Sequence, residues 1–211
     1  MSKKVKKPEE RELGYKLLTP FMRVAFRLWY NPKIIGAEKI PSESAIVIAC
    51  NHKHVFDQCL TVMATKRVIH YMAKKEYFDG KLAPLFRLVG CIPVDRERRD
   101  FASAKSALAV LKKGGAVGIF PEGTRNKTTD QFLLPFKTGC VAMAKKGDAW
   151  IVPCGLTGDY KFRSKNLTIR YGEPFKVGDM TPAEANDKLK REVERLMLEN
   201  LGKENKEIKN A

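Results

Sequence analysis

Continuous apolar runs alternate along the chain with segments whose apolar residues recur every three or four positions. The run AIVIAC at residues 45–50 is short and wholly apolar, which predicts a buried strand. Further strands are predicted at residues 68–72, 92–94, 116–120 and 150–156, and the alternating residues 167–171 predict an edge strand.

Helical periodicity fills most of the intervals between these strands. Residues 181–184, Thr-Pro-Ala-Glu, form a capping box with proline at the first helical position, and the helix they open is expected to end near Gly202. Other helices are predicted at residues 13–30, 58–65, 101–113 and 138–146, and residues 82–89 are predicted to be helical or irregular. Strands that alternate with helices predict an α/β fold with a central, mostly parallel or mixed sheet flanked by helices.

The predicted helix at residues 13–30 is basic and amphipathic. Lys16, Arg23 and Arg27 are spaced so that they share one helical face, and apolar and aromatic residues fill the remainder. Thr19 followed by Pro20 has the form of a cap and a first-turn proline, so a second helical segment is expected to start at Pro20. Two interpretations remain open: a helix lying in a membrane interface, and a terminal helix packing on the core.

This pattern divides the chain into three parts. Residues 1–33 are expected to form an N-terminal tail and amphipathic helices for a membrane interface. Residues 34–200 are expected to form a single folded domain, and residues 201–211 a polar C-terminal tail. No stretch of about 18–20 apolar residues occurs, and the polar start of the chain lacks the pattern of a secretory signal.

Charge is the unusual feature of the composition. Forty basic and 24 acidic residues give a net charge of +16 over 211 residues, and most of the excess lies in residues 1–150. Such a chain favours an anionic partner: nucleic acid, a membrane surface or a phosphorylated substrate. The five cysteines form no C-x-x-C pair, which argues against a zinc ribbon and is typical of a reducing compartment.

Candidate chemistry begins directly after the apolar run at residues 45–50, in the segment NHKHVFD. His52 and Asp57 are five residues apart, so their side chains meet only if a turn lies between them, as at a strand–loop–helix junction. A carboxylate beside an imidazole fixes its tautomer and makes it a better base for a substrate hydroxyl. A capping Asp with a surface His, or a metal site that includes His54, are the alternatives, and the second lacks a supporting acidic cluster.

Three further segments lie within predicted strands or directly after them. FPEGTR at residues 120–125 combines a turn glycine, Gly123, with Arg125, whose planar guanidinium suits a phosphate. GCIPVDR at residues 90–96 ends in an arginine cluster, and IVPCG at residues 151–155 is a strand with a proline, which is typical of an edge or a cleft wall.

Taken in this order, the four segments resemble the lysophosphatidate acyltransferase family, the 1-acyl-glycerol-3-phosphate O-acyltransferases. The resemblance covers roughly residues 34–160 and includes the F-K-x-G stretch at 136–139. Two features depart from it: His54 replaces a small polar residue, and the apolar N-terminal span of many relatives is missing.

The resemblance implies acyl transfer from acyl-CoA or acyl carrier protein to the sn-2 hydroxyl of 1-acyl-glycerol-3-phosphate, giving phosphatidic acid. His52 would be the base and Asp57 its partner, with no acyl-enzyme, no metal and no bound cofactor. Five residues would bind the glycerol-phosphate part of the substrate: Arg96, Glu122, Gly123, Thr124 and Arg125.

The partners expected on this basis are lysophosphatidate, the acyl thioester and an anionic membrane surface, with no nucleic acid. The expected location is cytoplasmic, peripheral on the inner face of the cell membrane, with Lys16, Arg23 and Arg27 facing the lipid. Two alternatives are kept: acyl transfer to glycerol-3-phosphate or another lysolipid, and a non-enzymatic basic protein that binds membranes or nucleic acid.

Overall fold

A computed structural model describes residues 8–95, 100–128 and 131–202 of the chain. Seven strands form one mixed sheet, and every neighbouring pair is parallel except β6 with β7. In spatial order the strands are β1 (Lys33–Ile35), β7 (Thr168–Tyr171), β6 (Trp150–Thr157), β2 (Ile46–Cys50), β5 (Ala116–Ile119), β3 (Ile69–Lys74) and β4 (Ile92–Val94). The predicted α/β architecture is confirmed.

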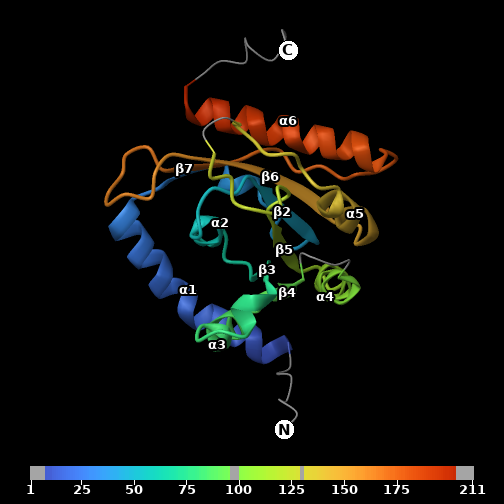
Figure 1. Ribbon diagram of the computed structural model, residues 1–211, viewed down its shortest axis with the longest axis horizontal. Coiled ribbons are helices and arrows are strands. Elements are labelled where there is room, and N and C mark those ends of the chain that lie inside the picture. The colour runs from blue at the N-terminus through green and yellow to red at the C-terminus, as the bar shows by residue number, and fades with distance from the viewer. Residues whose placement is uncertain (1–7, 96–99, 129–130, 203–211) are drawn as a thin grey trace.

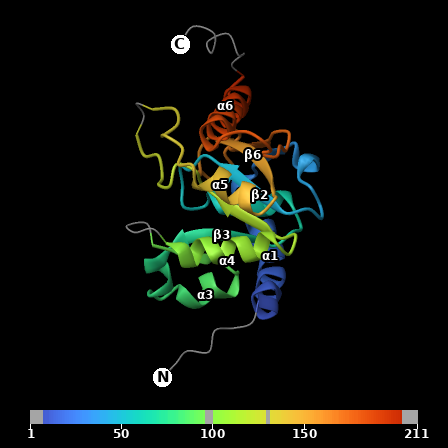
Figure 2. The ribbon, with the colours of Figure 1, turned by 90° about the vertical axis from the view of Figure 1, so that its right-hand side faces the viewer.

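Helices cover both faces of this sheet. One face carries α1 (Pro8–Tyr30), α2 (Asp57–Ala64) and α3 (Ala83–Leu88), and the other carries α4 (Phe101–Leu111), α5 (Gly139–Lys146) and α6 (Pro182–Asn200). Short 3₁₀ helices η1 (Ala37–Lys39) and η2 (Lys75–Phe78) complete the elements. Figure 1 shows α1 on the opposite side of the molecule from α4 and α5, and Figures 1 and 2 both place α6 against β6.

The central strand β2 shows how the two faces are filled. Ile46, Ile48 and Cys50 join the apolar cluster beneath α1 and α2, while Val47 and Ala49 join the cluster beneath α5 and α6. All five residues of β2 are buried, as the continuous apolar run predicts for a strand covered on both faces.

The order of the strands corrects two predictions. Residues 167–171 were expected at an edge, but β7 lies between β1 and β6, and the edge is the short strand β1, which the sequence analysis missed. Pro153 lies inside the central strand β6 rather than at an edge. The N–H of Ile151 donates to the carbonyl of Phe175, and the backbone nitrogen of Pro153, which has no hydrogen, points to the same side of β6. On that side the pairing of β6 is interrupted between Tyr171 and Phe175, so a proline is tolerated there.

The N-terminal helix also differs from the prediction. It is one helix from Pro8 to Tyr30 with Pro20 inside it, so no second segment starts at Pro20. Tyr15 before the proline and Met22 and Phe26 after it all pack on the same apolar cluster. These contacts hold both halves against the sheet, although Pro20 supplies no backbone N–H. The C-terminal helix α6 keeps the predicted capping box of Thr181 and Glu184.

Candidate active site

The candidate site is built from two loops that leave neighbouring parallel strands. The loop after β2 carries residues 51–57 and the loop after β5 carries residues 120–126, so both lie at the carboxyl edge of the sheet. Two hydrogen bonds join the loops. The backbone N–H of His52 donates to Oε1 of Glu122 over 2.6 Å, and the N–H of Asn126 donates to the carbonyl of His52 over 2.6 Å.

His52 and Asp57 meet in the way the spacing predicts. A turn closes between them, where the N–H of Asp57 donates to the carbonyl of His54, and Asp57 then begins α2. Nδ1 of His52 lies 2.7 Å from Oδ2 of Asp57. Because Asp57 accepts the Nδ1–H, the neutral imidazole carries its lone pair on Nε2, which is the arrangement of a general base.

The carboxylate of Asp57 is buried and fully hydrogen-bonded. Besides His52, Oδ2 accepts the backbone N–H groups of Lys53 at 2.7 Å and His54 at 2.8 Å, while Oδ1 accepts the hydroxyl of Tyr160 at 2.7 Å. A buried carboxylate is costly unless donors surround it, and its place in the first turn of a helix adds a favourable dipole. Asp57 is therefore suited to hold a negative charge beside His52.

Phe120 fixes the other side of the imidazole. Its ring stacks on His52 with centroids 4.0 Å apart and an interplanar angle of 10°, and it also stacks on Tyr71. The sequence places Phe120 in the FPEGTR segment but predicts no contact with His52. Its role depends on the direction of its side chain from the end of β5, which sequence spacing does not give.

Glu122 occupies a place that the sequence analysis did not predict. Its Oε2 accepts the N–H of Leu134 at 2.9 Å, and its Oε1 holds His52, so backbone donors occupy both oxygens of a nearly buried carboxylate. Burial raises the pKa of Glu122. This geometry supports a role for Glu122 in fixing the backbone of His52, and its expected contact with substrate stays a prediction.

Asn51 anchors the start of the same loop. Its side chain donates to the carbonyl of Leu156 at 3.0 Å and accepts the N–H of Leu156 at 2.7 Å. This two-bond clamp joins the end of β2 to the end of β6. The asparagine of the N-H-x-x-x-x-D motif therefore positions the histidine that follows it.

A cavity of about 550 Å³ opens beside His52 on the α1 face of the sheet. Thr124 and Arg125 line it together with His52, and no hydrogen bond or ion pair engages the Arg125 guanidinium within the part of the chain that the structure describes. The remainder of the lining is largely apolar or aromatic and includes Val55, Tyr71, Tyr77, Leu82, Phe86, Cys91 and Phe120. An imidazole, a guanidinium and an apolar wall thus face the same space.

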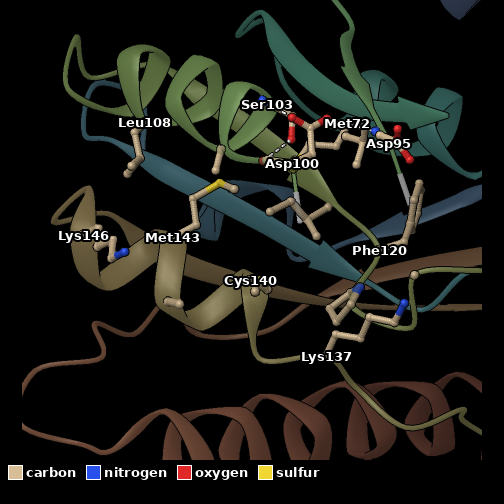
Figure 3. Close-up of a pocket in the computed structure, with 17 residues that line it drawn as sticks. Met72, Asp95, Asp100, Ser103, Leu108, Phe120, Lys137, Cys140, Met143 and Lys146 are labelled. Atoms are coloured by element: carbon tan, nitrogen blue, oxygen red, sulfur yellow. Dashed lines mark hydrogen bonds between the residues drawn. The ribbon is translucent and has the colours of Figure 1, made fainter. Parts of the chain in front are cut away.

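A second cavity, of about 410 Å³, lies on the opposite face of the sheet between α4 and α5. Leu108 projects from α4 and Met143 from α5 across it, and Lys137 lies at the end nearest Phe120 (Figure 3). Gly123 lines this cavity rather than the one beside His52, and its φ of +70° explains the glycine in that turn. Arg96 lies outside the described residues.

Burial shifts the pKa of three other titratable groups near the site. Burial lowers the pKa of His54, the residue that departs from the family pattern. Burial also raises the pKa of the Cys59 and Cys91 thiols to about 12. Within the described residues, no group of three or more His, Cys, Asp and Glu side chains is placed to bind a metal ion.

The segment that carries both loops also matches a known protein family. A family model described as acyltransferase matches residues 31–157, the segment that carries both loops of the site. A relative from Bacillus subtilis is 33% identical over 188 residues, which are 86% of this chain and 92% of that protein. The chain belongs to the acyltransferase family.

The relatives define the kind of acyltransferase more closely. The Bacillus subtilis protein is named 1-acyl-sn-glycerol-3-phosphate acyltransferase. So are relatives from Borreliella burgdorferi, 31% identical over 66% of this chain and 56% of that protein, and from Cocos nucifera, 34% identical over 74% and 54%. The crystal structure of the 1-acyl-sn-glycerophosphate acyltransferase from Thermotoga maritima matches with a TM-score of 0.74 at 22% identity. That match covers 93% of this chain and 83% of the other, and shows the same fold.

Proposed function

We propose that the chain transfers an acyl group from a thioester to the sn-2 hydroxyl of 1-acyl-glycerol-3-phosphate, giving phosphatidic acid. The observation that carries this proposal is the His52–Asp57 pair, joined over 2.7 Å at the wall of a cavity that also holds Arg125 and an apolar surface. The names of the relatives support the same acceptor.

The proposed reaction uses the lone pair on Nε2 of His52. This nitrogen takes the proton of the sn-2 hydroxyl as the oxygen attacks the thioester carbonyl, and Asp57 stabilises the imidazolium that forms. The tetrahedral intermediate collapses, the C–S bond breaks, and the thiolate leaves with the proton from His52. No acyl-enzyme is formed, which agrees with the raised pKa of Cys59 and Cys91, because thiols with such values are weak nucleophiles at neutral pH.

The cavity beside His52 suggests how the acceptor is bound. Arg125 offers a bidentate contact to the phosphate, with Thr124 beside it, and the apolar wall suits the acyl chain. Arg96 and Gly123 remain predicted substrate contacts. The donor, acyl-CoA or acyl carrier protein, is also part of the proposal, since both are anionic and suit a chain of net charge +16.

An anionic membrane surface is the proposed place of action, and α1 is the element that would meet it. Figure 1 shows that α1 runs along the outside of the molecule. This helix exposes a stripe of large apolar side chains. The stripe comprises Leu17, Leu18, Phe21, Val24, Leu28 and Trp29. The opposite stripe packs on the core, as one interpretation of this helix expected, and the exposed stripe supports the proposal of a membrane interface. Such exposed patches are typical of interaction surfaces.

Two of the three basic residues expected to face lipid, Arg23 and Arg27, bind the protein itself, and Lys16 remains a predicted lipid contact. Arg23 donates to the carbonyls of Val62 and Thr65 at the end of α2, and Arg27 donates to the carbonyl of Pro32. Both guanidiniums therefore bind the protein itself.

Basic residues next to the stripe come instead from the loop between β6 and β7. Phe162 of this loop is 64% exposed and meets Trp29 edge-on at 5.1 Å. Lys161, Arg163 and Lys165 flank it and are exposed. We propose that these side chains and the stripe contact the anionic cytoplasmic leaflet of the cell membrane. None of the helices in the described ranges is long and apolar enough to cross a bilayer.

The function is tested by offering purified protein lysophosphatidate, glycerol-3-phosphate or other lysolipids, each with acyl-CoA or acyl carrier protein thioester. The proposal predicts phosphatidic acid as the main product. Faster acylation of another acceptor would overturn the assigned substrate, and no transfer with any pair, together with salt-sensitive nucleic-acid binding, would favour the non-enzymatic alternative.

The membrane surface is tested by sedimentation with vesicles that contain anionic or only zwitterionic lipid. Phe21→Gln removes a side chain that is 77% exposed on the stripe, and Phe101→Gln is the matched control, 79% exposed at the start of α4. Phe21 would be buried in the lipid when the protein binds, so its loss predicts about tenfold weaker binding of Phe21→Gln to anionic vesicles. Equal binding of the two variants would contradict the proposal.

A further inference from the structure

Tyr160 lies beside the catalytic pair although it is 103 residues from Asp57 in the sequence. It belongs to the loop between β6 and β7, outside all four motif segments. Its hydroxyl donates to Oδ1 of Asp57 over 2.7 Å, and burial followed by the charge of Asp57 raises its pKa. The hydroxyl therefore stays protonated and acts as a donor at neutral pH.

The contact complements the other bonds of Asp57. Oδ2 of Asp57 accepts hydrogen bonds from His52 and from two backbone N–H groups, whereas Oδ1 accepts its hydrogen bond from the hydroxyl of Tyr160. Donors on both oxygens fix the rotation of the carboxylate about its Cβ–Cγ bond. The orientation of the carboxylate in turn fixes the plane of the His52 imidazole through Nδ1.

The ring of Tyr160 is itself held in place by aromatic neighbours. It stacks on His54 with centroids 4.3 Å apart and meets Tyr30 of α1 edge-on at 5.5 Å. The loop that carries it is held by hydrogen bonds on both sides of Tyr160. The N–H of Arg163 donates to the carbonyl of Trp29 over 2.6 Å, and Lys53 donates to the carbonyl of Gly158. Tyr160 is therefore a rigid support rather than a mobile side chain.

We propose that Tyr160 is a positioning residue for acyl transfer: it orients Asp57 and, through Asp57, the base His52. The rate effect rests on the proposed function, but the effect on the imidazole does not. Supporting contacts around a catalytic group are expected to matter because small misplacement of a base slows proton transfer. The hydroxyl is the active part, and the ring supplies its location.

Tyr160→Phe tests this proposal because it removes the hydroxyl and keeps the ring. The matched control is Tyr171→Phe, since the Tyr171 hydroxyl is buried and has no hydrogen-bond partner among the described residues. We expect kcat to fall about tenfold in Tyr160→Phe, with KM for both substrates unchanged. The melting temperature should fall by roughly 2–8 °C, because Oδ1 of the buried Asp57 loses its donor. The control is expected to match the wild type. A kcat within twofold of the wild type, or a change in KM alone, would overturn the proposal.

A second readout is independent of the reaction. With ¹⁵N-labelled histidine, the three imidazoles of the chain are those of His52, His54 and His70. His70 binds the carbonyl of Gly90, and serves as an internal reference. We expect Tyr160→Phe to move the His52 ring signals while those of His70 stay fixed. Unmoved His52 signals would refute the positioning role even if acyl transfer is observed, and moved signals without any acyl transfer would leave the role intact while removing the proposed function.

Discussion

Replacement of Glu122 by glutamine tests the position assigned to this carboxylate. The two oxygens of Glu122 accept backbone N–H groups of His52 at 2.6 Å and Leu134 at 2.9 Å. Glutamine has the same shape but one oxygen and one NH₂ group, so one buried N–H loses its acceptor. An unsatisfied buried donor costs about 1–3 kcal/mol. Glu122→Gln should therefore lower the free energy of unfolding by this amount.

The pH dependence gives the prediction a sign. Burial raises the pKa of Glu122 in the folded protein above its unfolded value. A group shifted in this direction contributes stability that is full below the unfolded pKa and is lost as pH rises through the folded pKa. Glutamine does not titrate. The free energy of unfolding of the wild type should therefore exceed that of Glu122→Gln by a larger amount at about pH 4 than at about pH 8.

Urea unfolding followed by circular dichroism measures both effects, with each protein studied at the two pH values. If Glu122 instead faced substrate from solvent, Glu122→Gln would leave the midpoint unchanged and only raise KM. A stability difference below about 0.5 kcal/mol, the range of ordinary surface substitutions, would refute the assigned position. A difference that grows toward pH 8 would refute the effect of burial.

Three further predictions address the support of the site. Asn51→Ala leaves both backbone groups of Leu156 unpaired, and should cost about 2–4 kcal/mol in urea unfolding; a cost under 1 kcal/mol would argue against the clamp. Arg23→Met keeps the apolar stem but loses two bonds to the end of α2, which predicts a melting temperature lower by roughly 2–8 °C and unchanged vesicle binding, whereas weaker vesicle binding at full stability would restore Arg23 to the membrane. Since burial raises the pKa of Cys59 and Cys91 to about 12, iodoacetamide at neutral pH should leave acyl transfer intact; rapid inactivation with label on either thiol would contradict the mechanism.

Local sequence patterns were enough to predict most of the helices and strands. Continuous apolar runs predicted the central strands because a strand covered on both faces has few polar positions. The capping box predicted the start of α6 because its two hydrogen bonds depend on residues only three apart. Pro20 misled the prediction for α1, since packing on both sides of the proline outweighed its missing N–H.

The site was predictable where it depends on short spacing. His52 and Asp57 meet because a turn joins a strand end to a helix start, and five residues suffice for that. The contacts of Phe120 and Tyr160 depend on how separate loops fold together, and no spacing encodes them. The helical period likewise placed Arg23 on a face of α1 but did not say whether that face meets lipid or the end of α2.

The most direct test of the account is the rate at which His52→Ala forms phosphatidic acid from lysophosphatidate and an acyl thioester. A general base contributes about 10²–10⁴-fold to such a reaction. We predict that the substitution lowers kcat by at least about 10²-fold in a protein that stays folded and binds vesicles as the wild type does. Its melting temperature should be somewhat lower, because the buried Asp57 loses one donor and Phe120 loses its stacking partner. A folded His52→Ala protein that forms phosphatidic acid within tenfold of the wild-type rate would contradict the central claim that His52 is the base.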